Sequence, residues 1–443
     1  MGIKLRELKA EARTLIKAGE ITAALAAYDH ILAANPLDYD SRLKVADLLA
    51  AAGDRPGAIS VYRAVAEHDI RSGHPLPAII AIRALESLGR PASDLVNMMA
   101  ELYALGAPTL AKFAARQAPV DLEASIERPD LTGGEPAEAV MARARDRALD
   151  LSVFVEYPTQ FLPLAFFSEL PPDVFVPVVR ALHVRRMRDG DLIIREGEPG
   201  TAFYLVATGQ VRVFSTNSLG KGSELTRLHE GALFGEMALL AAQPRTASVA
   251  VVDEADILEL GRGPLAVLEA EVPSLAPALA KFARERLLKN LLATSPLFRP
   301  FTRQQQMDLI RRFDGHEVAP GTEIIREGEA GLGLYVVLAG EVEVSKRHAT
   351  GAGEEVPLAR LRAGEVFGEM SLLRDQPTTA SVRAARQTAI LFLAREYFQR
   401  LVQAVPEIRS YFEKLSAARD LDTRRTLGNE AGRQTDPDVR VMI

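Results

Sequence analysis

The residue types best suited to binding chemistry gather in one segment, 234–247, which reads FGEMALLAAQPRTA. Gly235 lets the backbone pass close to a ligand, because no Cβ stands in the way. A short helical turn entered from this glycine leaves backbone N–H groups without intrahelical partners, and such groups bind anions. Arg245 adds a permanent, forked positive charge suited to phosphate oxygens, and the carboxylate of Glu236 can accept hydrogen bonds from ribose hydroxyls. The segment therefore predicts a binding site for a phosphate-bearing ligand.

A second segment, 367–380, reads FGEMSLLRDQPTTA and repeats the first with one chemical change. The carboxylate returns as Glu369, but Thr378 stands where the first segment has its arginine. A hydrogen bond to a charged group is worth about 1.5–3 kcal/mol, so we expect the affinity to fall by roughly one to two orders of magnitude. Arg383 lies too far along a strand to substitute, and we interpret Arg374 as a solvated surface residue. The second site is predicted to be weak, altered or silent, and its residues are Gly368, Glu369, Ser371, Thr378 and Thr379.

Both segments belong to a longer internal repeat, which predicts two homologous domains. The run IIREGE at 193–198 returns at 324–329, and short strands alternate with glycine turns in each copy. The runs around Gly209 and Gly340 are predicted to form hairpins. This pattern is typical of jelly-roll-like β-barrels with flanking helices. We place the first barrel at residues 150–290 and the second at 291–420.

A different repeat predicts helices at the N-terminus. Three residues recur 34 positions apart: Gly19, Ala24 and Tyr28 return as Gly53, Ala58 and Tyr62. A glycine between two helices, a small residue where they cross and an aromatic residue suit stacked helical hairpins. Over residues 1–107 the pattern resembles the tetratricopeptide repeat, with a plain helical bundle as the alternative. Residues 108–149 are rich in Pro, Gly, Glu and Asp, which predicts a linker that is helical at its end, and 421–443 form a polar tail.

The two barrel segments are similar to the phosphate-binding cassette of cyclic nucleotide-binding domains, as found in protein kinase A regulatory subunits and catabolite activator-type regulators. The turn at 197–200, GEPG, lies where this family places it. The resemblance implies cAMP or cGMP as the ligand of the first barrel, with no cofactor. Thr246 could bind a guanine amino group, but many cAMP binders also carry threonine there, so this residue is a weak indication of cGMP. We favour cAMP on the broader prior alone. The implied ligand-binding residues are Gly235, Glu236, Met237, Ala238, Arg245 and Thr246.

Composition excludes several other functions. The net charge of −6 argues against a surface for nucleic acid or anionic lipid. Without cysteine there is no thiolate metal site or cysteine nucleophile, and the 7 histidines are too scattered for metal catalysis. No apolar window is long enough to span a membrane, and the N-terminus does not read as a secretory signal. We therefore expect a cytoplasmic protein that is not an enzyme.

The favoured function is a sensor that relays ligand binding to a protein partner through its helical repeats. The helix at 275–292 is predicted to close over the base, with Leu287, Leu288 and Leu291 as an apolar lid, and to reorient the barrels. One alternative is an interaction scaffold whose barrels have lost their ligand. Another is a regulatory subunit of a separate kinase or other enzyme, although ARARDRA at 142–148 lacks a phosphoacceptor and does not match a kinase pseudosubstrate. Too few residues follow Ala394 for a DNA-binding domain, and a homo-oligomer is compatible with the sequence.

Overall fold

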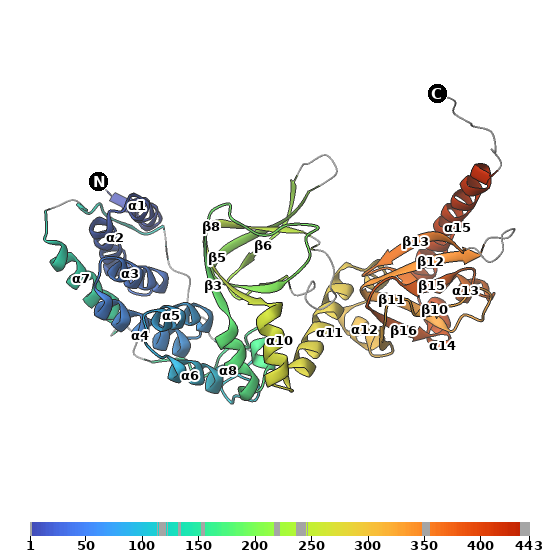
Figure 1. The fold of residues 1–443 in the computed structure, drawn as a ribbon, viewed down its shortest axis with the longest axis horizontal. Helices are drawn as coiled ribbons and strands as arrows, with labels where there is room; N and C mark the ends of the chain where they lie inside the picture. Colours follow the sequence, from blue (N-terminus) through green and yellow to red (C-terminus); the bar gives the residue numbers. More distant parts are fainter. Residues whose placement is uncertain are drawn as a thin grey trace, which may run out of the picture. The chain divides into compact units, whose positions relative to one another are not determined.

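The computed structural model describes residues 2–112, 114, 121, 123–131, 134–151, 156–216, 222–235, 245, 247–347 and 355–434. The described residues form two compact units, one running up to Leu279 and the other from Ala280 onward (Figure 1). The first unit contains a helical segment and a β-barrel, and the second contains another β-barrel with its helices.

Consecutive helices pack against one another through the N-terminal segment (Figure 1). The recurring glycines end up in equivalent turns, since Gly19 and Gly53 have φ angles of 81° and 93°, in the left-handed region that favours glycine. Ala24 and Ala58, which recur in the same register, are both fully buried. The helices are α1 (Leu5–Ala18), α2 (Ile21–Ala34), α3 (Tyr39–Ala51), α4 (Arg55–Ser72), α5 (Pro75–Ser87) and α6 (Ser93–Tyr103).

A seventh helix, α7 (Ala137–Leu149), packs on α2, α3 and α4 and so extends the helical segment. The buried Arg42 of α3 donates to the carbonyl oxygens of Ala148 at 2.6 Å and Asp150 at 2.9 Å, which satisfies the C-terminal end of α7. The helical end of the predicted linker is therefore fixed to helices α2, α3 and α4. A short strand pair, β1 (Gly2–Lys4) and β2 (Ser125–Glu127), also joins the N-terminus to this interval.

The first barrel is built on one twisted sheet with the order β3-β8-β5-β6, to which β4 adds on β8 and β7 on β5. Its core cluster includes Tyr204, Val206 and Ile257. The strands are β3 (His183–Arg188), β4 (Leu192–Ile194), β5 (Ala202–Thr216), β6 (Gly222–His229), β7 (Leu233–Phe234) and β8 (Ser248–Gly261). The 3-10 helix η1 (Phe167–Glu169) and helices α8 (Pro172–Ala181) and α10 (Arg262–Glu271) flank it.

The second barrel has two four-stranded sheets, ordered β10-β15-β12-β13 and β14-β11-β16-β9. Its strands are β9 (Asp314–Val318), β10 (Glu323–Ile325), β11 (Gly333–Ala339), β12 (Glu341–Arg347), β13 (Glu355–Arg362), β14 (Val366–Phe367), β15 (Ser381–Ala384) and β16 (Thr388–Ala394). Its helical elements are α11 (Leu275–Thr294), which begins in the first unit, η2 (Pro296–Phe298), α12 (Arg303–Ile310), α13 (Glu369–Arg374), α14 (Arg395–Ala404) and α15 (Pro406–Gln434).

The two predicted hairpins are wrong. At Gly209 the chain continues as one strand, β5, which bends while it stays paired with β8. At Gly340 it passes from β11 in one sheet to β12 in the other, and these two strands do not pair. A Cβ at Gly340 would lie 2.6 Å from the Thr388 Cα, so the glycine is required by close backbone approach rather than by a hairpin turn.

The leucines predicted to form a lid for the first barrel pack elsewhere. Leu287 and Leu291 are buried in the core of the second unit, in one cluster with Phe298 and Phe412, and Leu288 packs against that cluster. This packing anchors α11 to the helices of the second barrel. The predicted fold class, helices followed by two β-barrels with flanking helices, is confirmed. In the described part of the chain, no helix has the length and apolar character to cross a membrane.

Candidate ligand-binding sites in the two barrels

Arg245 and Thr378 occupy the same backbone position in the two barrels. Arg245 exchanges two backbone hydrogen bonds with the turn after β4, since Gly197 N donates to its oxygen at 2.9 Å and its nitrogen donates to Glu198 O at 2.8 Å. In the second barrel Gly328 N donates to Thr378 O, and Thr378 N donates to Glu329 O, both at 2.8 Å. The repeated glycine–glutamate turn thus fixes where each cassette ends.

The Arg245 side chain is only 8% exposed and points at the end of β7. Its Nη1 donates to Gly235 O at 2.6 Å and its Nη2 donates to Ala202 O at 2.7 Å. The guanidinium carbon lies 5.7 Å from the centre of the Tyr204 ring, which stacks on Phe234. Burial raises the pKa of the Tyr204 hydroxyl. The barrel therefore holds a permanent positive charge at the start of its cassette.

Gly235 is required beside this arginine. Its φ angle is 78°, and a Cβ built on it would lie 2.7 Å from Arg245 Nη1. Any side chain here would displace the guanidinium as well as strain the backbone. Gly368 plays the same backbone role in the second barrel, where a Cβ would lie 2.7 Å from Gly333 O.

Four predicted ligand-binding residues of the first barrel lie outside the described residues: Glu236, Met237, Ala238 and Thr246. Gly235 and Arg245 are the two that are described, and they are in contact.

All five residues predicted for the second site line one cavity of about 240 Å³. Glu369 begins α13 and is 1% exposed, and Arg419 of α15 pairs with its Oε1 atom at 2.8 Å. Ser371 is also buried and donates to Gly368 O at 3.0 Å. Sequence reasoning missed Arg419, because its distance from Glu369 along the chain leaves no local pattern that would link them.

The hydroxyl of Thr378 forms its hydrogen bonds within the barrel. The side chain is 7% exposed, and its Oγ1 lies 2.5 Å from Arg326 O and 3.1 Å from Glu329 O. A hydroxyl has one proton to donate, so these carbonyl oxygens take it. The second site consequently has neither a cation nor a donor directed to the ligand at the position that Arg245 fills in the first.

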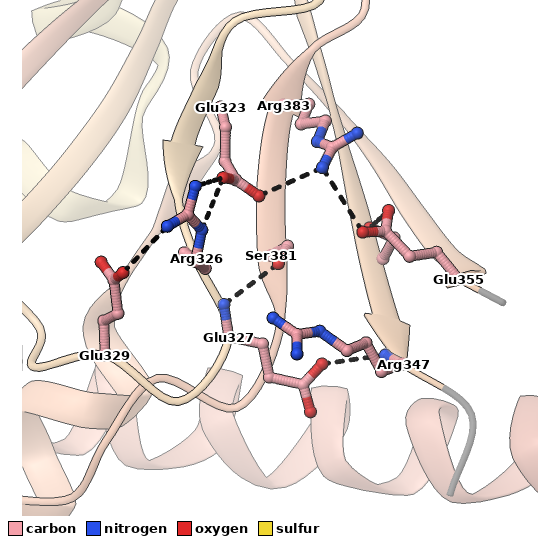
Figure 2. Close-up of polar contacts among 9 residues, drawn as sticks. Glu323, Arg326, Glu327, Glu329, Arg347, Glu355, Ser381 and Arg383 are labelled. Atoms are coloured by element: carbon pink, nitrogen blue, oxygen red, sulfur yellow. Dashed lines mark hydrogen bonds and ion pairs between the residues drawn. The ribbon is translucent and has the colours of Figure 1, made fainter. Parts of the chain in front are cut away.

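The arginines near the second site are held by carboxylates. Figure 2 shows Arg326 between Glu323 and Glu329, and Arg383 between Glu323 at 3.2 Å and Glu355 at 3.5 Å. In the same view Glu327 accepts a hydrogen bond from the backbone nitrogen of Arg347. Arg383 is thus committed elsewhere, in keeping with the expectation that it cannot replace the missing arginine.

Arg374 is more than the solvated residue that the sequence suggested. It donates to the Ser416 hydroxyl at 3.0 Å and pairs with Asp420, both on α15. Together with the pair between Glu369 and Arg419, it ties α13 to α15 beside the cavity. Within the described residues, no group of three or more histidine, aspartate or glutamate side chains could hold a metal ion.

Comparison with known proteins finds a domain family that matches both barrels. The family model for the cyclic nucleotide-binding domain matches residues 184–269 and 316–405, one match in each barrel. The cAMP-dependent protein kinase regulatory subunits of Blastocladiella emersonii and Yarrowia lipolytica are each 30% identical to the chain over 243 residues. These alignments cover 55% and 54% of this chain and 58% and 59% of the two relatives. The chain thus matches less than two thirds of either relative's length.

Two solved structures also match part of the chain. The regulatory domain of Toxoplasma gondii PKA with cAMP is 24% identical, with a TM-score of 0.28, covering 57% of this chain and 92% of that one. The catabolite activator protein of Thermus thermophilus is 31% identical, with a TM-score of 0.28, covering 31% of this chain and 63% of that one.

Proposed function

We propose that this chain, which carries two cyclic nucleotide-binding domains in tandem, senses a cyclic nucleotide through the first of them. The observation that carries the proposal is the buried Arg245, whose guanidinium lies beside Gly235 at the start of the cassette. A cyclic phosphodiester has one negative charge, and a forked guanidinium can meet two of its oxygens. The second domain has Thr378 at that position, and we propose that it does not bind this ligand.

The proposed ligand is cAMP in preference to cGMP. The relatives named above are regulatory subunits of cAMP-dependent protein kinases, which supports the preference. Glu236 would accept hydrogen bonds from the ribose, and the backbone near Ala238 would meet the phosphate. The chain binds its ligand without chemical change, needs no cofactor and acts in the cytoplasm.

The sensed signal is proposed to reach a protein partner through the helical segment and the helix that leaves the first barrel. Several contacts fix the helical segment to this barrel, among them the ion pairs between Asp47 and Arg186 and between Lys44 and Glu254. A ligand that binds two arrangements unequally would shift the population between them. The names of the relatives favour a second candidate for this partner, the catalytic chain of a separate kinase.

Thermal unfolding of the full chain with cAMP and with cGMP tests the sensor. A ligand that binds only the folded state at a hundredfold excess over its dissociation constant stabilises it by about 2.7 kcal/mol, so the melting temperature should rise. We expect Arg245→Ala to abolish most of this rise. The control is Arg195→Ala, because Arg195 is an exposed residue of the same barrel that pairs only with neighbouring Glu198 in the contacts described here.

Equal responses of wild type and Arg245→Ala to either nucleotide would refute the assignment of the site. A full response in Arg195→Ala is required for the loss in Arg245→Ala to be specific.

A further inference from the structure

We propose that the cavity of the second barrel binds an uncharged nucleoside, a flat base on a ribose with free hydroxyls, in preference to a cyclic nucleotide. The inference rests on the proposed function in taking both barrels as ligand-binding domains, and it gives the second a different ligand. Everything it uses lies within the second unit.

The size and walls of the cavity suit a base. Its volume of about 240 Å³ is below the ~300–1,000 Å³ usual for drug-sized ligands. Apolar side chains line it from both sheets: Ile325, Val344, Leu358, Leu361, Phe367 and Val382. Such a surface buries the faces of a heterocycle and gains free energy in proportion to the apolar area removed from water.

The sugar end is provided by Glu369. Its Oε1 accepts from Arg419, and within the described residues this pair uses that oxygen alone, so Oε2 can accept hydrogen bonds from ribose hydroxyls. Hydrogen bonds from neutral donors to a carboxylate are stronger than those to a neutral acceptor. This end therefore recognises hydroxyl groups without requiring a charge on the ligand.

The part of the cavity around Thr378, where a phosphate would lie, disfavours an anion. Thr378 directs its hydroxyl to the carbonyl oxygens of Arg326 and Glu329, and no guanidinium replaces the one that Arg245 supplies in the first barrel. Arg326 itself is shared between Glu323 and Glu329, as Figure 2 shows. A phosphodiester placed beside Thr378 would lose hydration without gaining a charged donor from that residue, whereas a hydroxymethyl group would lose little.

Lys346 is the one remaining cation among the residues that line the cavity, besides Arg419. It lies on β12 next to Ser345, whose strand partner is Ser381 of β15. An anionic ligand could still be attracted to it, so the test includes this residue.

The experiment is calorimetric titration of the full chain carrying Arg245→Ala, which removes the proposed first site. The probes are adenosine, guanosine, cAMP and cGMP. We expect one nucleoside to bind at least tenfold more tightly than its cyclic nucleotide. Adding Glu369→Gln should lower the affinity for that nucleoside by about tenfold or more, since a hydrogen bond to a charged acceptor is lost. Arg383 is a surface arginine outside the cavity, so Arg383→Ala should leave the nucleoside affinity unchanged.

A gain-of-function variant tests the phosphate end directly. Thr378→Arg, also in the Arg245→Ala chain, should raise cAMP affinity by about ten- to a hundredfold, because it restores a charged donor at the equivalent backbone position. If this variant does not fold, wild-type chain saturated with cAMP and then titrated with nucleosides gives the same comparison without a substitution in the second barrel.

Three results would overturn the proposal: cAMP binding the Arg245→Ala chain as tightly as any nucleoside, a loss of such cAMP binding on Lys346→Ala, or no nucleoside binding at millimolar concentration. Failure of the proposed function is distinct from these results. The proposed function fails if the wild type and Arg245→Ala bind cAMP with the same affinity, irrespective of the results with nucleosides.

Discussion

Arg245 holds a charged guanidinium where only 8% of the residue is exposed, with two backbone carbonyl oxygens among its partners. A phosphate oxygen that reached the guanidinium would meet a full positive charge in a site of low dielectric, where the attraction is stronger than in water. At the matching position Thr378 is neutral and its hydroxyl donates to the barrel's own carbonyl oxygens, which is why we propose different ligands for the two barrels.

Gly235→Ala should remove ligand binding by displacing this guanidinium. Its Cβ would lie 2.7 Å from Arg245 Nη1, and the left-handed φ of 78° adds strain of about 1–2 kcal/mol. Gly190→Ala is the matched control, since its φ is 80° but nothing lies within 4 Å of the added Cβ. Both variants should melt at lower temperature, and only Gly235→Ala should lose the response to cAMP. Equal ligand responses in the two variants would contradict the contact.

Helix α15 completes the second cavity, because Arg419 pairs with Glu369 and Asp420 with Arg374 of α13. Helix α11 is joined to the same unit through Leu287 and Leu291. Ion pairs thus hold α13 to α15 beside the cavity, and apolar packing holds α11 to the core of the same unit. Residues of both α13 and α15 line the cavity.

Arg419→Ala should loosen α13, because it leaves the buried Glu369 without its charged partner. The loss of a hydrogen bond between charged groups costs about 1.5–3 kcal/mol, which hydrogen exchange of the α13 amides would report as faster exchange. Arg425→Ala on the same helix is the control, because Arg425 is exposed and pairs weakly with Asp422 at 3.9 Å. Unchanged exchange in Arg419→Ala would show that the pair does not hold the helix.

The sequence predicted where strands and turns occur better than it predicted which parts of the chain they pack against. The repeated IIREGE run correctly predicted equivalent strands and turns, because that information is local. The hairpin at Gly340 failed for a physical reason: a glycine between two apolar runs looks the same whether the chain turns back in one sheet or crosses into another. Periodic leucines at 287 and 291 indicated a buried face but not which barrel would bury it. The Arg419 partner of Glu369 depends on tertiary packing alone.

In the first unit as a whole, the helical segment and the barrel share a network of charges. Asp47 of α3 accepts a hydrogen bond from Tyr62 of α4 at 2.5 Å and pairs with Arg186 of β3. Burial, together with the Asp47 carboxylate, raises the pKa of Tyr62, so its hydroxyl stays protonated and able to donate. Arg186 also lies 3.8 Å from Asp256 of β8. The network gives the proposed signal a physical route between a barrel strand and the helices.

Asp47→Ala should uncouple the helical segment from the barrel. It removes two charge-assisted contacts at once, each worth about 1.5–3 kcal/mol where buried. If cAMP binding alters hydrogen exchange in α3 and α4, this variant should keep the binding and lose most of that change. Asp94→Ala is the control, because the Arg63–Asp94 pair is exposed and worth about 0–1 kcal/mol. A full exchange response in Asp47→Ala would rule out this route.

The central claim, one cyclic nucleotide site formed around Arg245, is tested most directly by the stoichiometry of cAMP binding to the full chain. Calorimetric titration should give one equivalent of cAMP per chain in the wild type and no comparable heat in Arg245→Ala. Two equivalents, or one equivalent that persists in Arg245→Ala, would contradict the account and place cAMP in the second barrel.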